Sequence, residues 1–310
     1  MRAGRFAAVV SLILIAADAP HPKGYVCDRA NGPIAVDGKL DDRAWSRAPW
    51  TDDFVDIEGD ARPRPRFRTR AKMLWDDRYL YIAAELEEPD VWGRLTAHDA
   101  VLFRDLDFEV FVDPDGDNHE YAELEINALG TTWDLFLARP YRDAGEARNS
   151  FEIEGLKSAV HVAGTLNKPG DKDEGWTVEI AMPWSSFAGF AHAPIPPRDG
   201  DQWRLNFSRV EWRHRVRGGE YEPIPKSEDN WVWSPQGRIA MHMPERWGYV
   251  QFSSAEPGTT PFRPDPTWPA RARLMQVYEA QQAFRAETGR YARSLGKLGI
   301  APGELAIVLT

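Results

Sequence analysis

The sequence predicts an all-β protein: an antiparallel two-sheet β-sandwich, jelly-roll-like, with a short C-terminal helical tail. Between residues 33 and 252 apolar residues recur mostly at every second position, the spacing of strands that bury one face. Clusters of Gly, Pro, Asp and Asn interrupt these runs at short intervals, as turns do. No amphipathic helical stretch of crossover length separates them, which excludes a βαβ fold. Many short strands in about 220 residues favour a sandwich or jelly roll.

Residues 1–19 are expected to be a signal peptide. Two cations, Arg2 and Arg5, precede an apolar run from Phe6 to Ala17, and Ala17-Asp18-Ala19 has the small-residue pattern of a cleavage site. The run of about 12 residues is too short to span a membrane. We therefore expect a secreted or periplasmic protein without a membrane span.

The segment 25–253 is expected to form the sandwich. The clearest alternating runs are 71–74, 79–86, 106–112, 122–128, 133–138, 176–182, 203–210 and 248–252. A short helix is expected from Asp41, because Asp41 and Asp42 provide the acidic start that a helix dipole favours.

The segment 254–310 is expected to be a Pro-rich linker followed by C-terminal helices. Five prolines between residues 253 and 269 exclude a central strand. Apolar residues from Leu274 to Phe284 then follow helical spacing, Gly289 ends that helix, and Leu295 and Leu298 indicate a second, short one. This tail is too small to form its own core, so we expect it to pack on the sandwich, with a docking helix as the alternative.

Composition and motifs exclude several functions. A net charge of −10 argues against nucleic-acid binding, and a single cysteine, Cys27, excludes an intrachain disulfide. The chain has no GxGxxG, P-loop, HExxH or GxSxG motif. We therefore expect the protein to have no enzymatic activity of its own. If it is an enzyme, we expect it to be a glycoside hydrolase. The 13 tryptophans form either core or a binding surface.

The hairpin 106–128 carries the most concentrated chemistry. Asp107 and Glu109 alternate with apolar residues in its first strand, as do Glu123, Glu125 and Asn127 in its second. Glu109 should therefore lie near Glu123 or Glu125 across the pair. One outward face gathers at least three carboxylates and an amide.

Four interpretations of this face stay open. Carboxylates and amides bind sugar hydroxyls, with aromatic rings stacking on the sugar. Hard oxygen ligands also suit calcium, and its candidate ligands are Asp113, Asp115 and Asp117 in the turn. Gly116 is misplaced for an EF-hand, and the alternative is a plain Asp/Gly turn without an ion. Paired carboxylates could hydrolyse glycosides. The fourth interpretation is a solvated sheet face.

Several stretches resemble the family 9 carbohydrate-binding modules and their DOMON-related relatives. They are IAVDGKLDDRAW (34–45), WDDRYLYI (75–82) with EEPDVW (87–92), DFEVFVDPDGD (107–117), ELEINALGT (123–131) and GWTVEIAMPW (175–184). The resemblance covers roughly residues 33–252. It implies a β-sandwich, sugar recognition between aromatic rings, structural calcium, and attachment to glycoside hydrolases without hydrolysis by the module itself. Haem binding, known in DOMON relatives, is disfavoured because no His/Met pair has strand spacing.

The resemblance also implies roles for single residues. Glu109 matches the family's sugar-binding Glu and Asn127 its Asn, whereas Glu125 stands where sugar-binding relatives have Arg. Phe103 aligns with one of the two sandwiching tryptophans, and the other is expected at Trp231 or Trp233. Replacing Arg by Glu inverts a charge, and Phe offers less stacking area than Trp.

The tryptophans divide into two groups by sequence context. Five tryptophans are expected in the core. Four of them have apolar neighbours, and Trp184 follows Pro183 at the end of a strand: Trp45, Trp75, Trp176, Trp184 and Trp203. Those flanking the acidic face or in turn-rich segments are ligand candidates, with core packing as the alternative: Trp92, Trp133, Trp212, Trp231 and Trp233.

The sequence as a whole predicts an exported carbohydrate-binding protein that recognises mono- or oligosaccharides, alongside glycoside hydrolases in polysaccharide breakdown or uptake. The predicted ligand-binding residues are Phe103, Glu109, Glu123, Glu125, Asn127, Trp92, Trp231 and Trp233. One alternative is a glycoside hydrolase using Glu109 and Glu125. The other is an extracytoplasmic interaction module that uses the tail as a docking element.

Overall fold

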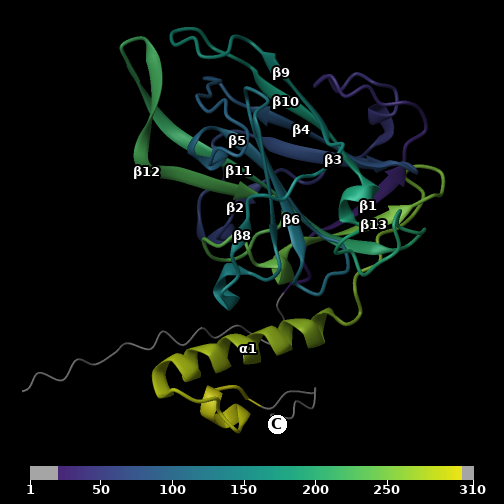
Figure 1. Ribbon diagram of the computed structural model, residues 1–310, viewed down its shortest axis with the longest axis vertical. Coiled ribbons are helices and arrows are strands. Elements are labelled where there is room, and N and C mark those ends of the chain that lie inside the picture. Colours follow the sequence, from purple (N-terminus) through teal and green to yellow (C-terminus); the bar gives the residue numbers. More distant parts are fainter. Residues whose placement is uncertain (1–19, 302–310) are drawn as a thin grey trace, which may run out of the picture. The chain divides into compact units, whose positions relative to one another are not determined.

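The protein is described here by a computed structural model that covers residues 20–301 (Figure 1). The predicted signal peptide, residues 1–19, lies outside the described residues, as do residues 302–310. The described residues belong to two compact units. One is Pro22–Arg263, and the other joins the N-terminal stretch up to His21 with the C-terminal stretch from Pro264.

The unit Pro22–Arg263 is built mainly from β-strands, as the alternating pattern predicts. Its strands are β1 (Gly24–Arg29), β2 (Val55–Asp56), β3 (Thr69–Trp75), β4 (Tyr79–Glu87), β5 (Asp107–Asp113), β6 (Tyr121–Asn127), β7 (Thr132–Leu137), β8 (Ala147–Arg148), β9 (Lys157–Ala163), β10 (Gly175–Pro183), β11 (Gln202–Arg217), β12 (Glu220–Val232) and β13 (Gly248–Ser253). Short 3-10 helices connect them: η1 (Trp45–Arg47), η2 (Gly59–Ala61), η3 (Leu102–Arg104), η4 (Tyr141–Asp143), η5 (Trp184–Phe187) and η6 (Pro244–Arg246). The helix predicted from Asp41 is not formed there: residues 41–44 are turns and bends, and the 3-10 turn η1 begins at Trp45.

The strands form one mixed sheet, so the prediction of an antiparallel fold is only partly right. The order is β8-β7-β6-β5-β11-β13-β1-β3-β4-β10-β9, with β12 pairing to β11 and β2. The first strand, β1, lies parallel to both β13 and β3, with Tyr25 opposite Val250. Alternation of apolar residues shows which face of a strand is buried but not the direction of the strand. The sequence pattern therefore could not predict that β1 lies parallel between β13 and β3.

The sheet curls around one apolar core. Phe108 and Leu124 of β5 and β6 share this core with Ile82 and Ile180 of β4 and β10, which lie towards the other end of the strand order. The tryptophans predicted to be core are all buried: Trp45, Trp75, Trp176, Trp184 and Trp203. Burial of such large side chains is a main favourable term in folding.

The second unit contains the predicted C-terminal helix, α1 (Trp268–Thr288), followed by η7 (Leu295–Leu298). Gly289 ends α1 in a left-handed conformation, φ 75°, and donates its N–H to the Arg285 carbonyl, as a glycine C-cap does. At the start of α1, the ring of His21 lies 5.8 Å from that of Trp268. Packing of this tail on the sheet stays a prediction. Across residues 20–301, α1 is long enough to cross a bilayer at 21 residues but is too polar, and the other helices are too short.

Candidate functional site

The hairpin of β5 and β6 has the two faces that the sequence predicts. Phe108, Val110 and Leu124 point into the core. On the opposite face Glu109 pairs directly with Glu125, and Phe111 pairs with Glu123. The predicted meeting of Glu109 with Glu125 across the strands is therefore present.

The acidic face is covered, which corrects the expectation of outward, solvated carboxylates. Glu109 and Glu123 are 4% exposed and Glu125 is 2% exposed. The covering segment is η3, whose Phe103 backbone N–H donates to the Glu125 carboxylate at 3.0 Å. The Phe103 carbonyl in turn accepts the indole N–H of Trp212 at 2.9 Å. Period-two alternation predicts this polar face but cannot show that a loop folds over it.

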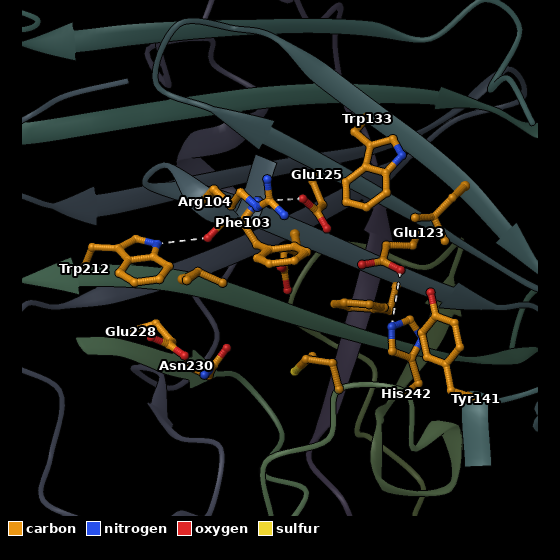
Figure 2. A pocket seen from close by; sticks show the side chains of 15 residues that line it. Phe103, Arg104, Glu123, Glu125, Trp133, Tyr141, Trp212, Glu228, Asn230 and His242 are labelled. Carbon is orange, nitrogen blue, oxygen red and sulfur yellow. Dashed lines mark hydrogen bonds and ion pairs between the residues drawn. The ribbon is translucent and has the colours of Figure 1, made fainter. Parts of the chain in front are cut away.

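Between this face and its cover lies a pocket of about 430 Å³ (Figure 2). Its walls come from β5, β6, β7, β11 and β12 and from the segments around η3, η4 and residues 241–242. The lining residues are Phe103, Arg104, Glu109, Phe111, Glu123, Glu125, Trp133, Leu135, Tyr141, Val210, Trp212, Glu228, Asn230, Met241 and His242. Phe103 and Tyr141 are 41% and 48% exposed, which is unusual for rings of this size and leaves ring surface open to a ligand.

Asp107, Glu109, Glu123 and Glu125 form a buried carboxylate cluster. Burial raises the pKa of Glu109 to about 7, and burial followed by the charge of Glu109 holds the pKa of the other three well above the usual range. One oxygen each of Asp107, Glu109 and Glu123 accepts no hydrogen bond from the described residues. At neutral pH the carboxylate cluster therefore holds shared protons, and it can both donate to and accept from a polar ligand.

His242 lies beside this cluster without neutralising it. Its Nε2 is 3.7 Å from the Glu123 carboxylate, and its Nδ1 is 3.0 Å from the Tyr121 hydroxyl. Burial lowers the pKa of His242 to about 4, so its ring is neutral at pH 7. Arg104, on the exposed rim, is the cation among the lining residues.

The structure brings together half of the predicted ligand-binding residues. Phe103, Glu109, Glu123 and Glu125 line the pocket, whereas Asn127, Trp92, Trp231 and Trp233 do not. Asn127 is buried and holds its own turn, because its amide donates to the Leu95 carbonyl at 2.8 Å and its oxygen accepts two backbone N–H groups.

The three tryptophans outside the pocket require a correction. Trp92 is fully buried beside Leu106, in a small cluster of its own. Trp231 and Trp233 are 2% and 1% exposed in the main core, and the Arg209 guanidinium lies 5.2 Å from the Trp231 ring centroid. Their ring faces are already covered, so core packing, the alternative that the sequence left open, applies to all three.

Other residues that line the pocket were not among the predicted ligand-binding residues. Trp133 and Trp212, both ligand candidates by sequence, do line the pocket, and the indole N–H of Trp133 has no hydrogen-bond partner among the described residues. Tyr141 begins η4 and His242 lies in the segment before η6, and neither has a sequence signal beyond a turn-rich context.

The turn Asp113–Asn118 uses its carboxylates internally. Asp113 accepts the backbone N–H groups of Gly116 and Asn118, at 2.8 and 3.0 Å, and Asp115 accepts that of Asp117. The turn is therefore held without an ion. One oxygen from each of Asp113, Asp115 and Asp117 nevertheless lies within 4.8 Å of the others, so calcium there stays a prediction.

A curled β sheet carrying a pocket of aromatic rings and carboxylates defines a ligand-binding β domain. The sequence model of the carbohydrate family 9 binding domain-like family matches residues 36–198. The chain belongs to this family.

Individual relatives are more distant. The chain is 27% identical over 155 residues to exoglucanase XynX of Acetivibrio thermocellus and 28% identical over 153 residues to endo-1,4-beta-xylanase C of Paenibacillus barcinonensis. These matches cover 50% and 49% of this chain but only 12% of the length of each relative. A crystal structure of a candidate carbohydrate-binding protein from Bacteroides uniformis aligns with a TM-score of 0.56 at 18% identity, over 75% of this chain and all of that one, so the fold is shared.

Proposed function

We propose that this chain is an exported carbohydrate-binding protein whose mono- or oligosaccharide ligand occupies the pocket above β5 and β6. The observation that carries this proposal is the juxtaposition of the half-exposed Phe103 ring with the buried carboxylates of Glu109 and Glu125. A sugar presents an apolar ring face and a rim of hydroxyls, and this pocket offers a partner for each. Export is proposed on the pattern of residues 1–19.

Hydrogen bonding in the pocket is suited to hydroxyl groups. A hydroxyl donates to an ionised carboxylate and accepts from a protonated one, and the carboxylate cluster holds both forms near pH 7. A ligand that makes these bonds relieves the cost of buried acceptors without partners.

The names of the matched relatives guide the choice of ligand. Because they are an exoglucanase and a xylanase, glucose, xylose and their β-1,4 oligomers are the first sugars to test. We also propose that the protein acts beside glycoside hydrolases in polysaccharide breakdown or uptake.

The pocket favours binding over hydrolysis. Glu109, Glu123 and Glu125 lie on one face of two adjacent strands and therefore approach a ligand from one side. Glycoside hydrolysis needs two carboxylates that flank the scissile bond. The hydrolase alternative is therefore not developed further, and the interaction-module alternative stays a prediction.

Replacing Phe103 by Ala should weaken sugar binding by about tenfold, because the variant removes the exposed ring face but leaves the carboxylates in place. Isothermal titration calorimetry of the wild type and the variant with glucose and xylose oligomers measures this loss. Tyr291→Ala removes a ring that is 51% exposed in the C-terminal unit and should leave affinity unchanged. Equal affinity of the wild type and Phe103→Ala would contradict stacking on Phe103.

The pocket should also discriminate against acidic sugars. At pH 8 the Glu109 carboxyl, with a pKa of about 7, is mostly ionised, and a uronate brought next to it is repelled. We expect glucuronate to bind at least about tenfold more weakly than glucose at pH 8 and low salt, with a smaller difference at pH 5. Competition titrations at the two pH values measure this, and equal or tighter binding of glucuronate at pH 8 would count against a sugar site at the carboxylate cluster.

A further inference from the structure

A second group of polar side chains meets on the structure outside the sugar pocket. His98 and Asp99, a few residues before η3, approach Asp134 of β7 and Glu152 of the loop after β8. The Nε2 atom of His98 lies 3.4 Å from Asp99 Oδ1, 3.8 Å from Asp134 Oδ1 and 3.2 Å from Glu152 Oε2. We call these four residues the His98 cluster.

The orientation of the His98 ring is fixed from its other side. Its Nδ1 is 3.0 Å from the carbonyl oxygen of Thr132 and 3.3 Å from the Thr132 hydroxyl. Because the carbonyl can only accept, the shorter contact is a hydrogen bond when Nδ1 carries the proton. The lone pair or second proton at Nε2 therefore faces the three carboxylates. A backbone carbonyl that accepts the N–H opposite the coordinating nitrogen is the usual support of a metal-binding histidine.

A proton on Nε2 cannot satisfy all three carboxylates, because it forms one hydrogen bond. Asp134 is 2% exposed; its Oδ2 accepts the Ile153 N–H, but its Oδ1 has no hydrogen-bond partner among the described residues and faces His98. Asp99 Oδ1 is also buried and unpartnered. Orphaned buried acceptors of this kind imply a missing partner.

We propose that His98, Asp99, Asp134 and Glu152 bind a divalent transition metal ion, with zinc as the expected occupant. His98, Asp99 and Asp134 each offer a ligand atom within 4.8 Å of the other two, and Glu152 Oε2 lies 3.2 Å from His98 Nε2 as a fourth candidate. An imidazole nitrogen with carboxylate oxygens is a ligand set that zinc accepts. Bonds of about 2.0–2.2 Å at tetrahedral angles separate neighbouring ligand atoms by about 3.4 Å. The three distances from His98 Nε2, 3.2 to 3.8 Å, bracket that separation.

Such an ion would join three segments of the chain. Asp134 lies in the sheet, whereas His98 with Asp99 and Glu152 lie in loops on either side of it in the sequence. Residues 98–99 precede Phe103, so the ion would also brace the loop that covers the sugar pocket. The proposal stands on the His98 cluster alone and does not rest on sugar binding.

The test uses the full chain without a histidine tag, stripped of metal by a chelator that is then removed. Titration with ZnCl₂ by calorimetry should give one ion per chain and a higher unfolding temperature, because the ion binds the folded state. His98→Ala should weaken zinc binding by about tenfold or more, and Glu152→Gln should weaken it by a smaller factor. Calcium, which lacks affinity for imidazole, should bind the His98 cluster more weakly than zinc.

Two controls separate this site from other zinc binding. His161→Ala removes an exposed histidine of β9, and Asp115→Asn alters the acidic turn; neither should change the zinc affinity of the His98 cluster. Circular dichroism checks that each variant is folded. Absence of zinc binding by the wild type, or equal zinc affinity of the wild type and a folded His98→Ala variant, would overturn the proposal.

Discussion

Replacing Arg209 by Met should lower the free energy of unfolding by about 3–5 kcal/mol, because it removes the cation from a buried ion network. Arg209 is fully buried, and its guanidinium lies 2.6 Å from the Glu88 carboxylate and 2.7 Å from that of Glu211. Burial, followed by the charge of the neighbouring Glu211, raises the pKa of Glu88 to about 9. Met fills a similar volume but removes the guanidinium from both buried carboxylates, and Glu211 keeps the partly exposed Arg66, 3.6 Å away, as its cation.

Urea unfolding of the wild type and Arg209→Met measures this effect. Arg215→Met is the matched control: Arg215 lies 3.0 Å from the Glu222 carboxylate and its side chain is 58% exposed, so its loss should cost less than about 1 kcal/mol. Equal destabilisation by the two variants would mean that the buried network contributes no more than a surface ion pair. Trp231 packs against Arg209, and the network therefore also explains why this ring belongs to the core.

The second large effect is a loss of stability as the pH rises. The pKa of Glu109 is raised by burial from an ordinary 4.5 to about 7, so the folded state holds this proton more tightly than the unfolded chain. The resulting stabilisation is fully present below pH 4.5 and is lost as the pH rises through 7. At about 1.4 kcal/mol per pKa unit, the loss from this one group is on the order of 3 kcal/mol.

Glu109→Gln isolates this contribution, because Gln stays neutral at every pH. Urea unfolding at pH 5 and pH 8 should show a larger fall in stability for the wild type than for the variant. Glu154→Gln, which changes an exposed carboxylate, should follow the wild type. A pH dependence of Glu109→Gln as steep as that of the wild type would show that Glu109 does not hold its proton in the folded state.

The sequence predicted the strands and the chemistry of the hairpin, because both depend on local alternation. Glu109 and Glu125 face each other as their positions require, and Trp176 and Trp203 are buried as their apolar neighbours indicate. The parallel insertion of β1 depends on contacts between the two ends of the domain, which no local pattern encodes.

The rest of the candidate site depends on loops. Tyr141 and His242 reach the pocket from segments whose paths are set by tertiary packing, and Trp212 reaches it from the part of β11 that pairs with β12. Trp231 and Trp233 were expected beside a ligand because they lie in a turn-rich segment. Their side chains instead lie two positions apart on the same side of the chain and pack in the core. The resemblance to family 9 modules led to Phe103, which the structure places in the pocket.

A crystal structure of the protein with a bound glucose or xylose oligomer tests the central claim most directly. We expect the sugar in the pocket, with a ring face against Phe103 and hydroxyls within hydrogen-bond distance of Glu109 and Glu125. A sugar bound elsewhere, or an empty pocket in crystals soaked at concentrations that saturate binding in solution, would contradict the account.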